Sequence, residues 1–391
     1  MKRKHMKRTA LRLALALLLA AFALTGKAQV KVTDATNGNI VILAQIQDTK
    51  GRLMGFTTKE GMIPDDIKAA EGLTIHHMAY ETYTLTAADI EAKTVALTPR
   101  TYNVDEVVIK GGSQDYIYLR GYYRKYTSIE MLDTLKQEYT EGMLEYLIKN
   151  KDMTLSKRPR VLTADIYTVK STGDSIVKTS FKHNDKKTLS AARRFLPSLS
   201  SELLINSYKV EKLNFSLNAD TLQGKFWPKA YFSKSGKTIN VGTDELADKE
   251  GHSMRFPLLS TLLGVDIKFT DMNDNHLYHL REPGQYKFSS LMGVSSCKEA
   301  LMGGKRIVKI INRKYDANFS KKDYPMKGHF YSEVFFTDME YISKEKAKEI
   351  KKQEGFDESV VTEIPESTPE LSPATAKLKE ITIKNENDKK Q

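Results

Sequence analysis

Histidine and carboxylate side chains, the residue types that could hold a catalytic metal, come closest together around residue 276. His276 and His279 lie three positions apart, with Asp271 before them and Glu282 after them. A catalytic zinc site needs such ligands to converge and to leave one position open. The two histidines would share one face of a helix, but positions three apart on a strand point to opposite faces. The sequence thus gives four candidate metal ligands without a spacing that brings them together, and we expect no resident cofactor.

Other chemical signatures are incomplete or absent. The turn-rich run Asp271-Met272-Asn273-Asp274-Asn275 resembles the start of a calcium loop, but His276 occupies the sixth position, which requires glycine. The sequence contains no His-Glu-x-x-His, no Gly-x-Ser-x-Gly and no complete glycine-rich phosphate loop. An enzyme is therefore less favoured than a protein without catalytic activity.

The chain has one cysteine, Cys297, so no disulfide can form within it. The surrounding segment, residues 293–298, has no recognisable context for an activated thiolate. We predict that Cys297 is a small buried side chain.

The first 28 residues have the pattern of a secretory signal. A basic start, Met1–Arg8, precedes an apolar run from Leu13 to Leu24 that is too short to span a bilayer comfortably. We predict cleavage after Ala28, which leaves Gln29 as the first residue of the mature chain. The protein is then expected in the periplasm or at the outer membrane, and no later apolar run approaches the length of a membrane helix.

The formal net charge of +12 invites a nucleic-acid interpretation. However, seven of the 61 Lys and Arg residues lie within residues 1–28, which contain no acid. The remaining 54 basic residues stand against 49 acidic ones, a net charge of +5. Because this is an ordinary charge for a protein surface, no nucleic-acid partner is expected.

The stretch from Thr36 to Val108 has the clearest strand pattern. A run rich in β-branched residues, Ile40–Asp48, ends at the turn signal Thr49-Lys50-Gly51, and a second run follows at Leu53–Thr58. This order predicts two strands joined by a tight turn.

The same stretch resembles the carboxypeptidase-regulatory-like domain, a transthyretin-like β-sandwich at the N-terminus of many bacterial envelope proteins. Besides the two strands, the resemblance is carried by Thr36–Asn39, Gly55–Gly61, Met78–Glu81, Val95–Pro99 and Val104–Ile109. It implies a β-sandwich over residues 29–110 and an accessory module, not a peptidase. Pro64 departs from the family pattern, and because proline cannot donate to a ladder, we expect a short edge strand or a turn there.

Residues 111–343 are expected to form a second, larger β-rich domain, and Gly111-Gly112-Ser113 marks the boundary. Alternating segments separated by turn signals predict an antiparallel sheet that curls or stacks, with helices only at 189–195 and 200–205. The predicted strands are 115–126, 138–148, 161–169, 175–181, 208–217, 221–232, 265–269, 286–291, 306–311 and 329–336. Residues 138–148 could form a helix or a strand, and Gly142 and the tyrosines favour a strand. Segments 304–310, 327–331 and 339–342 also loosely resemble the curved-sheet envelope proteins that carry lipoproteins or lipids.

The composition changes again over residues 344–391. Lys344–Lys352 is a charged helix former, and no aromatic residue follows Phe356. Pro365, Pro369 and Pro373 stand among Ser, Thr and Glu, so we predict a disordered tail after the helix.

Together these patterns predict a mainly β protein, with a transthyretin-like sandwich followed by a larger antiparallel, curved sheet and few helices. The favoured function is binding or scaffolding towards an envelope protein, a glycan or a lipid. The alternative is a periplasmic hydrolase whose site is built from scattered His, Asp and Glu residues of the second domain.

Overall fold

The computed structural model describes most of the chain from Gln29 onwards. The described residues are 29–49, 51–58, 60–100, 115–151, 155–182, 220–223, 229–235, 238–244, 253–255, 262–279, 289–366, 368–371 and 373–390. The predicted helices at 189–195 and 200–205, the predicted strand at 208–217, the boundary glycines and the cleavage residue Ala28 lie outside them. Within the described residues the fold is mainly β, with large antiparallel sheets and few helices, as the sequence predicts.

The N-terminal part, residues 29–100, contains two small sheets around one apolar core. One sheet pairs β1 (Lys31–Asp34) in parallel with β6 (Thr94–Leu97). The other has the order β3-β2-β4-β5 and is built from β2 (Gln45–Gln47), β3 (Leu53–Phe56), β4 (Thr74–His76) and β5 (Tyr83–Thr84). Buried Val, Ile and Leu side chains from both sheets meet between them, and a short helix, α2 (Ala87–Ala92), precedes β6.

The strand–turn–strand prediction is confirmed, because β2 pairs antiparallel with β3 and Gly51 adopts a φ of 74° in the turn between them. The expectation at Pro64 is also confirmed. Met62 makes only an isolated bridge to Lys31, and a turn follows, closed by the bond from the Ile67 N–H to the Pro64 carbonyl.

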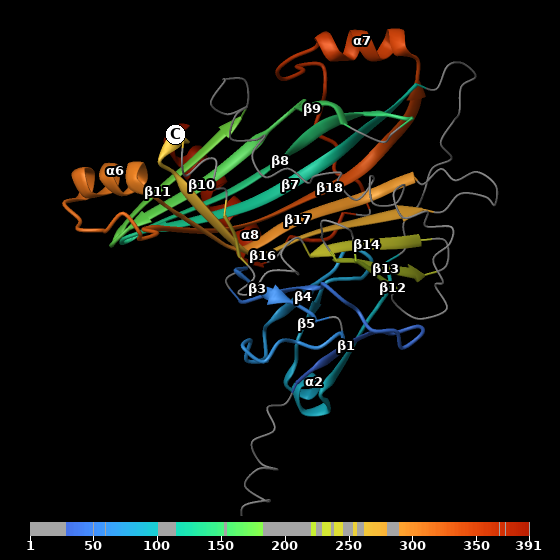
Figure 1. The fold of residues 1–391 in the computed structure, drawn as a ribbon, viewed down its shortest axis with the longest axis horizontal. Helices are drawn as coiled ribbons and strands as arrows, with labels where there is room; N and C mark the ends of the chain where they lie inside the picture. Colours follow the sequence, from blue (N-terminus) through green and yellow to red (C-terminus); the bar gives the residue numbers. More distant parts are fainter. Residues whose placement is uncertain are drawn as a thin grey trace, which may run out of the picture.

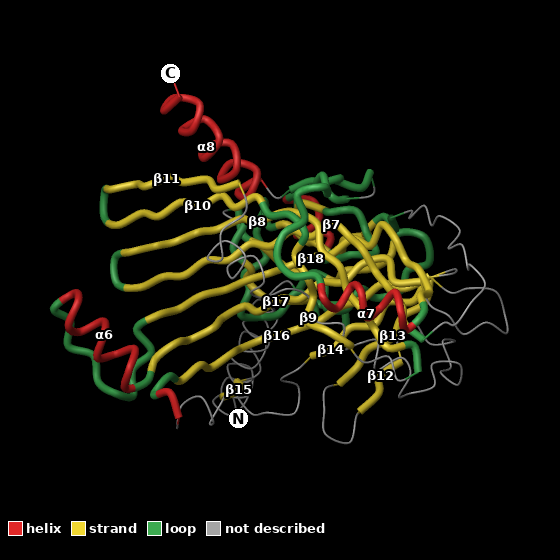
Figure 2. Tube along the Cα trace, turned by 90° about the horizontal axis from the view of Figure 1, so that it is seen from above, coloured by secondary structure: helices red, strands yellow, loops and turns green. Residues whose placement is uncertain are grey.

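Among the described residues, the remaining strands form one twelve-stranded antiparallel sheet. Its path is β11-β10-β8-β7-β18-β17-β16-β14-β13-β12, with β9 beside β8 and β15 beside β16. The strands are β7 (Tyr116–Met131), β8 (Thr134–Lys149), β9 (Leu155–Val161), β10 (Asp165–Thr172), β11 (Ser175–Lys182), β12 (Asp220–Gln223), β13 (Lys229–Ser235), β14 (Thr238–Asp244), β15 (Ser253–Arg255), β16 (Asp266–His279), β17 (Ser289–Gly303) and β18 (Met326–Ile342). The longest have 16 or 17 residues and span about 50 Å each. Figures 1 and 2 show them running side by side, with the N-terminal part packed on one side of the sheet.

Side chains on the central strands alternate between two faces. We call one of them the junction face, because the N-terminal part and the C-terminal segment both pack on it. On this face, side chains that lie opposite one another on neighbouring strands form rows across the sheet. One row consists of Tyr331, Tyr126, Tyr139 and Tyr167, and the next consists of Glu333, Arg124 and Glu141. The opposite face carries an apolar cluster that includes Leu119, Tyr123, Leu144, Tyr146 and Val334.

The predicted strand over 161–169 is interrupted, because β9 ends at Val161 and β10 begins at Asp165. Between them the chain crosses β8 at Gly142, where a Cβ atom would collide with the Thr163 carbonyl oxygen. The amides of Leu162 and Thr163 both donate to the Met143 carbonyl. The contact between residues 162–163 and β8, which the local sequence pattern does not encode, therefore interrupts the predicted strand.

Two predictions of local structure are wrong. Residues 306–311, predicted as a strand, belong to helix α6 (Lys305–Tyr315), in which Val308 and Ile311 fall on one buried side. Its paired β-branched residues favour a strand by propensity but also fit the helical period. The turn-rich run 271–275 lies instead inside the continuous strand β16, because β14 and β17 pair with it on both sides.

At the C-terminus, helix α7 (Lys344–Lys352) lies where the sequence predicts one. The sequence predicts a disordered tail here, whereas in the structure residues 373–390 form helix α8, which packs against β10 and β11. Its Leu378 is buried among the tyrosines of the junction face, although the tail itself has no aromatic residue. The sheet thus supplies the apolar surface that the tail lacks. In the part of the chain that the structure describes, no helix is long and apolar enough to cross a membrane.

Candidate functional site

The junction between the N-terminal part and the sheet is centred on Glu333, whose side chain is fully buried. His76, at the end of β4, approaches Glu333 Oε1 with its Nε2 atom at 2.6 Å. Arg124, on the neighbouring strand β7, donates from Nε to the other carboxylate oxygen. Burial alone would raise the pKa of Glu333, but Arg124 and then His76 outweigh it and lower this pKa to about 2. Glu333 is therefore ionised at neutral pH, and its carboxylate links the two parts.

The ionised carboxylate also fixes which ring nitrogen of His76 donates to it. A carboxylate only accepts hydrogen bonds, so Nε2 of His76 carries the proton. The other ring nitrogen, Nδ1, lies 3.0 Å from the Thr82 hydroxyl. Both nitrogens are thus used, and His76 holds β4 against the sheet.

The C-terminal segment closes the same network from another side. Arg124 donates from Nη1 to the carbonyl oxygen of Pro369 at 2.6 Å. Glu141 accepts hydrogen bonds from the hydroxyls of Tyr122 and Tyr139, each at 2.9 Å, and from Lys379 of α8. Buried polar groups are stabilising only when each has its partners, and here three parts of the chain supply them.

A second link joins His77 to Asn240 on β14. The Ala79 amide donates to His77 Nδ1 at 3.1 Å, so Nε2 of the neutral ring is the donor towards the terminal group of Asn240, 3.3 Å away, which accepts through its amide oxygen. Burial, followed by the neighbouring His76, lowers the pKa of His77 to about 3. The ring is therefore neutral at pH 7, which its acceptor role towards Ala79 requires.

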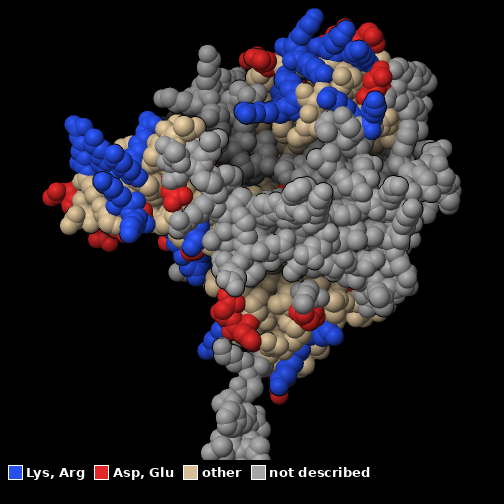
Figure 3. Space-filling model, in the orientation of Figure 1, with Lys and Arg blue, Asp and Glu red and all other residues tan. Residues whose placement is uncertain are grey.

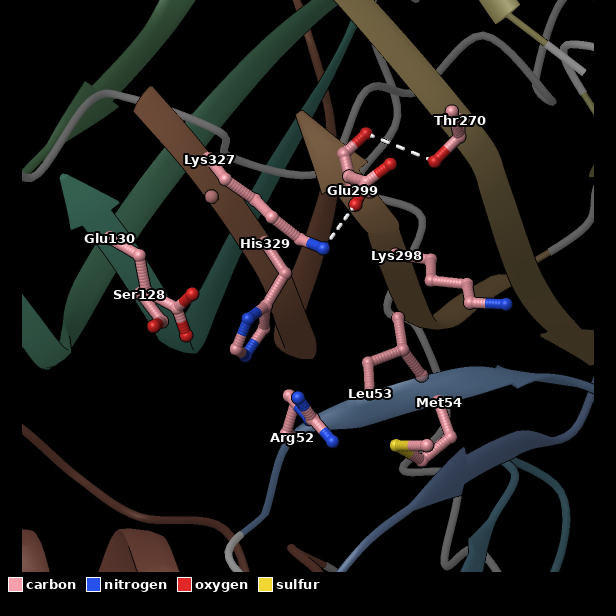
Figure 4. A pocket seen from close by; sticks show the side chains of 11 residues that line it. Arg52, Leu53, Met54, Ser128, Glu130, Thr270, Lys298, Glu299, Lys327 and His329 are labelled. Atoms are coloured by element: carbon pink, nitrogen blue, oxygen red, sulfur yellow. Dashed lines mark hydrogen bonds and ion pairs between the residues drawn. The ribbon is translucent and has the colours of Figure 1, made fainter. Parts of the chain in front are cut away.

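A cleft of about 450 Å³ opens beside this junction, between the β2–β3 hairpin and the sheet. Figure 4 shows its lining side chains, with the His329 ring directed from β18 towards Arg52 of the hairpin. Its volume is in the range of small-ligand sites. The lining residues are Arg52, Leu53, Met54, Ser128, Glu130, Thr270, Lys298, Glu299, Lys327, Gly328 and His329.

Three cations line the cleft, and each pairs with a carboxylate near the surface. Arg52 lies 3.3 Å from Asp48, Lys298 lies 3.3 Å from Asp66, and Lys327 contacts Glu299. The Arg52 and Lys327 side chains are 56% and 57% exposed, so each of their pairs contributes only about 0–1 kcal/mol. A ligand anion could exchange with these carboxylates at little cost.

His329 forms the buried end of the cleft. It is 9% exposed, and its ring packs 5.4 Å from that of Tyr126. Burial, and then the nearby Arg52, lowers the pKa of His329 to about 4, so the ring is neutral at pH 7. Its buried Nε2 atom makes no hydrogen bond to any residue that the structure describes. A polar atom with this burial normally has a partner, and Nε2 lies within the wall of the cleft, not at its surface.

The four candidate metal ligands do not meet as a described site. His276 is buried in β16, where its ring stacks at 6.1 Å on Tyr278 and lies against Gly293. His279 follows on the same strand, three positions later. The side chains of Asp271 and His279, and all of Glu282, lie outside the described residues. Among the residues that the structure describes, no three His, Cys, Asp or Glu side chains are close enough to hold a metal.

Cys297 is fully buried, as predicted, and its thiol lies 3.2 Å from the Glu299 carbonyl oxygen. The residues at the junction were not found from the sequence. One signal was present: Lys327, His329, Tyr331 and Glu333 alternate along one strand with Gly328, Phe330 and Val334. A strand with polar groups on one side normally exposes them to water, and only the packing of other parts buries them.

Comparison with known proteins gives little. No family model and no curated protein matches the chain. Among solved structures, lipovitellin is similar over 59% of this chain, with 8% identity and a TM-score of 0.29, and the chain spans about a quarter (26%) of its length. An acetoacetate decarboxylase-like enzyme from Sphingomonas wittichii RW1 is matched over 58% of this chain and 92% of its own, with 7% identity and a TM-score of 0.09. At these scores neither similarity supports an inference.

Proposed function

We propose that this chain is an exported binding protein of the bacterial envelope and that the junction cleft holds a small, hydroxylated anion such as an acidic sugar. Export is supported by the basic start and apolar run of residues 1–28, together with the resemblance of residues 36–109 to an envelope sandwich module. The ligand class is inferred from one observation: the cleft has three cations at its opening and a neutral, buried imidazole at its inner end.

Each part of such a ligand has a matching group. A carboxylate or phosphate would take the place of Asp48 or Glu299 beside Arg52 and Lys327. A hydroxyl group would bond to His329 Nε2 once the ring turns into the cleft, since this atom is buried in the structure, and Leu53 and Met54 offer apolar surface to the carbon skeleton.

Hydrolysis is the weaker alternative at this cleft. Ser128 faces His329 across the β7–β18 ladder, and these are the residue types of a nucleophile and its base. However, a histidine whose pKa is about 4 is a poor base at neutral pH, because an efficient general base has a pKa near the operating pH. Binding therefore explains the cleft better than catalysis does.

Isothermal titration calorimetry with digalacturonate tests the ligand class, and galactobiose is the uncharged control. We expect binding of the acidic disaccharide only, weakened about tenfold or more by Arg52→Gln, because a hydrogen bond to a charged group contributes about 1.5–3 kcal/mol. Lys346→Gln is the matched control, because Lys346 is a half-exposed cation, paired with Glu340, that does not line the cleft. Equal affinity for both sugars, or equal loss in both variants, contradicts the proposed ligand.

Export is tested separately by expressing the full chain in a Gram-negative host and sequencing the N-terminus of the product. We expect the product in the envelope fraction, beginning at Gln29. A cytoplasmic product that keeps Met1 would refute export without affecting the cleft.

A further inference from the structure

Helix α6 (Lys305–Tyr315) lies at one end of the long sheet, in the connection between β17 and β18. Figures 1 and 2 show it beyond the ends of these strands, at the left of both views and away from the N-terminal part. Val308 and Ile311 are buried and hold the helix to the molecule. The other side of the helix is exposed.

The exposed side of α6 is basic. It carries Lys305, Arg306, Lys309, Arg313 and Lys314, and the helix contains no acidic residue. In Figure 3 Lys and Arg side chains form a group at this end of the molecule, as others do over α7, with a few Asp and Glu side chains beside them. Like charges four positions apart, as at 305, 309 and 313, repel one another and weaken a helix. Arg313 and Lys314, in the last turn, favour the helix dipole, but Lys305, Arg306 and Lys309 do not serve the stability of the helix itself.

Large apolar side chains are exposed at the same end. Ile310 lies between the basic residues and is 55% exposed. Leu262 and Leu263, just before β16, are 71% and 48% exposed. They lie beside the start of α6, because the Arg306 amide donates to the carbonyl oxygen of the next residue, Gly264, at 2.8 Å. Three large aliphatic groups in a basic surface are the composition of an interfacial membrane-binding element.

We infer that this end of the molecule docks on an anionic lipid bilayer. The basic side of α6 contacts the headgroup phosphates, while Leu262, Leu263 and Ile310 enter the boundary between headgroups and acyl chains. Charge complementarity favours this partner, and the aliphatic groups favour lipid over nucleic acid, which would call for aromatic stacking surfaces. Only Tyr315 supplies an exposed aromatic ring on α6. The inference does not depend on the junction cleft or its ligand.

Co-sedimentation with vesicles tests this inference. The full chain is expressed, and the product is purified in the form that the host leaves after its own processing. It is then mixed with vesicles of phosphatidylglycerol and phosphatidylcholine (1:1) or of phosphatidylcholine alone. We expect binding to the anionic vesicles only, with a marked loss at high salt because exposed charges are screened. No binding to the anionic vesicles, or equal binding to both, would overturn the inference.

Variants separate the α6 surface from general charge. The triple variant Lys309→Gln, Arg313→Gln, Lys314→Gln is expected to bind about a hundredfold more weakly, since each basic residue near the surface contributes about a fivefold gain. The matched control removes three exposed lysines of α7, in Lys344→Gln, Lys348→Gln, Lys352→Gln, and should bind as the parent does.

The apolar contribution has its own test. Leu262→Ser with Leu263→Ser should weaken vesicle binding at least tenfold with the charge unchanged. An equal loss in the α7 control, or no loss in the leucine variant, would overturn docking by this surface. If the α6 triple variant loses binding to a heparin column but keeps binding to the anionic vesicles, the partner is another polyanion and the lipid inference is wrong.

Discussion

Replacing Glu333 by glutamine should show whether its buried carboxylate joins the N-terminal part to the sheet. The side chain is fully buried between His76 and Arg124. Its pKa falls from 4.5 to about 2, which corresponds to about 3 kcal/mol of stabilisation of the ionised form. Removing one partner of a buried ion pair costs about 3–5 kcal/mol, because the other charge is left buried without compensation. Both estimates predict a loss of about 3–5 kcal/mol for Glu333→Gln at pH 7.

The assay is urea unfolding of the purified protein at pH 7. Glu299→Gln is the control, since its pair with Lys327 is partly exposed and should contribute about 1 kcal/mol or less. Because the folded pKa of Glu333 is lowered, its contribution is complete above about pH 4.5 and is lost as the pH falls towards 2. A loss below about 1 kcal/mol in Glu333→Gln, or one no larger than in the control, would refute the reasoning.

Three further predictions concern stability. The pKa values of His77 and His329 are lowered to about 3 and about 4, so both rings stay neutral in the folded protein at pH 5, where the unfolded chain has taken up protons. Each histidine should therefore lower the free energy of unfolding by about 2 kcal/mol between pH 7 and pH 5. Urea midpoints measured across this range should fall, and they should fall less steeply in His77→Gln. Gly142→Ala should lower the free energy of unfolding by about 1–3 kcal/mol, because the new methyl group meets the Thr163 carbonyl; an unchanged thermal midpoint would contradict this packing. Thr86→Ala removes the capping box of α2 and should cost about 1 kcal/mol in the same unfolding assay, whereas an unchanged value would mean that α2 does not depend on this cap.

Much of the strand content could be predicted from the sequence. The alternation along 115–126, 138–148 and 329–336 predicts strands, because side chains of successive residues in a strand point to opposite faces, and these segments overlap β7, β8 and β18. The turn at Gly51 and the helix at Lys344–Lys352 are equally local, since each depends on residue types within a few positions. The burial of Cys297 follows from residue type alone.

The tertiary structure decided the features that depend on distant segments. Strand β16 continues through Asp271–Asn275 because two neighbouring strands pair with it there, and the local turn preference is overridden. The C-terminal segment becomes ordered because a tyrosine-lined face receives Leu378. The cleft and the Glu333 network combine residues more than 200 positions apart, such as His76 and Glu333. Local residue types therefore determined where strands and helices can form, but only the pairing of strands and the burial of charge between them determined where the cleft opens.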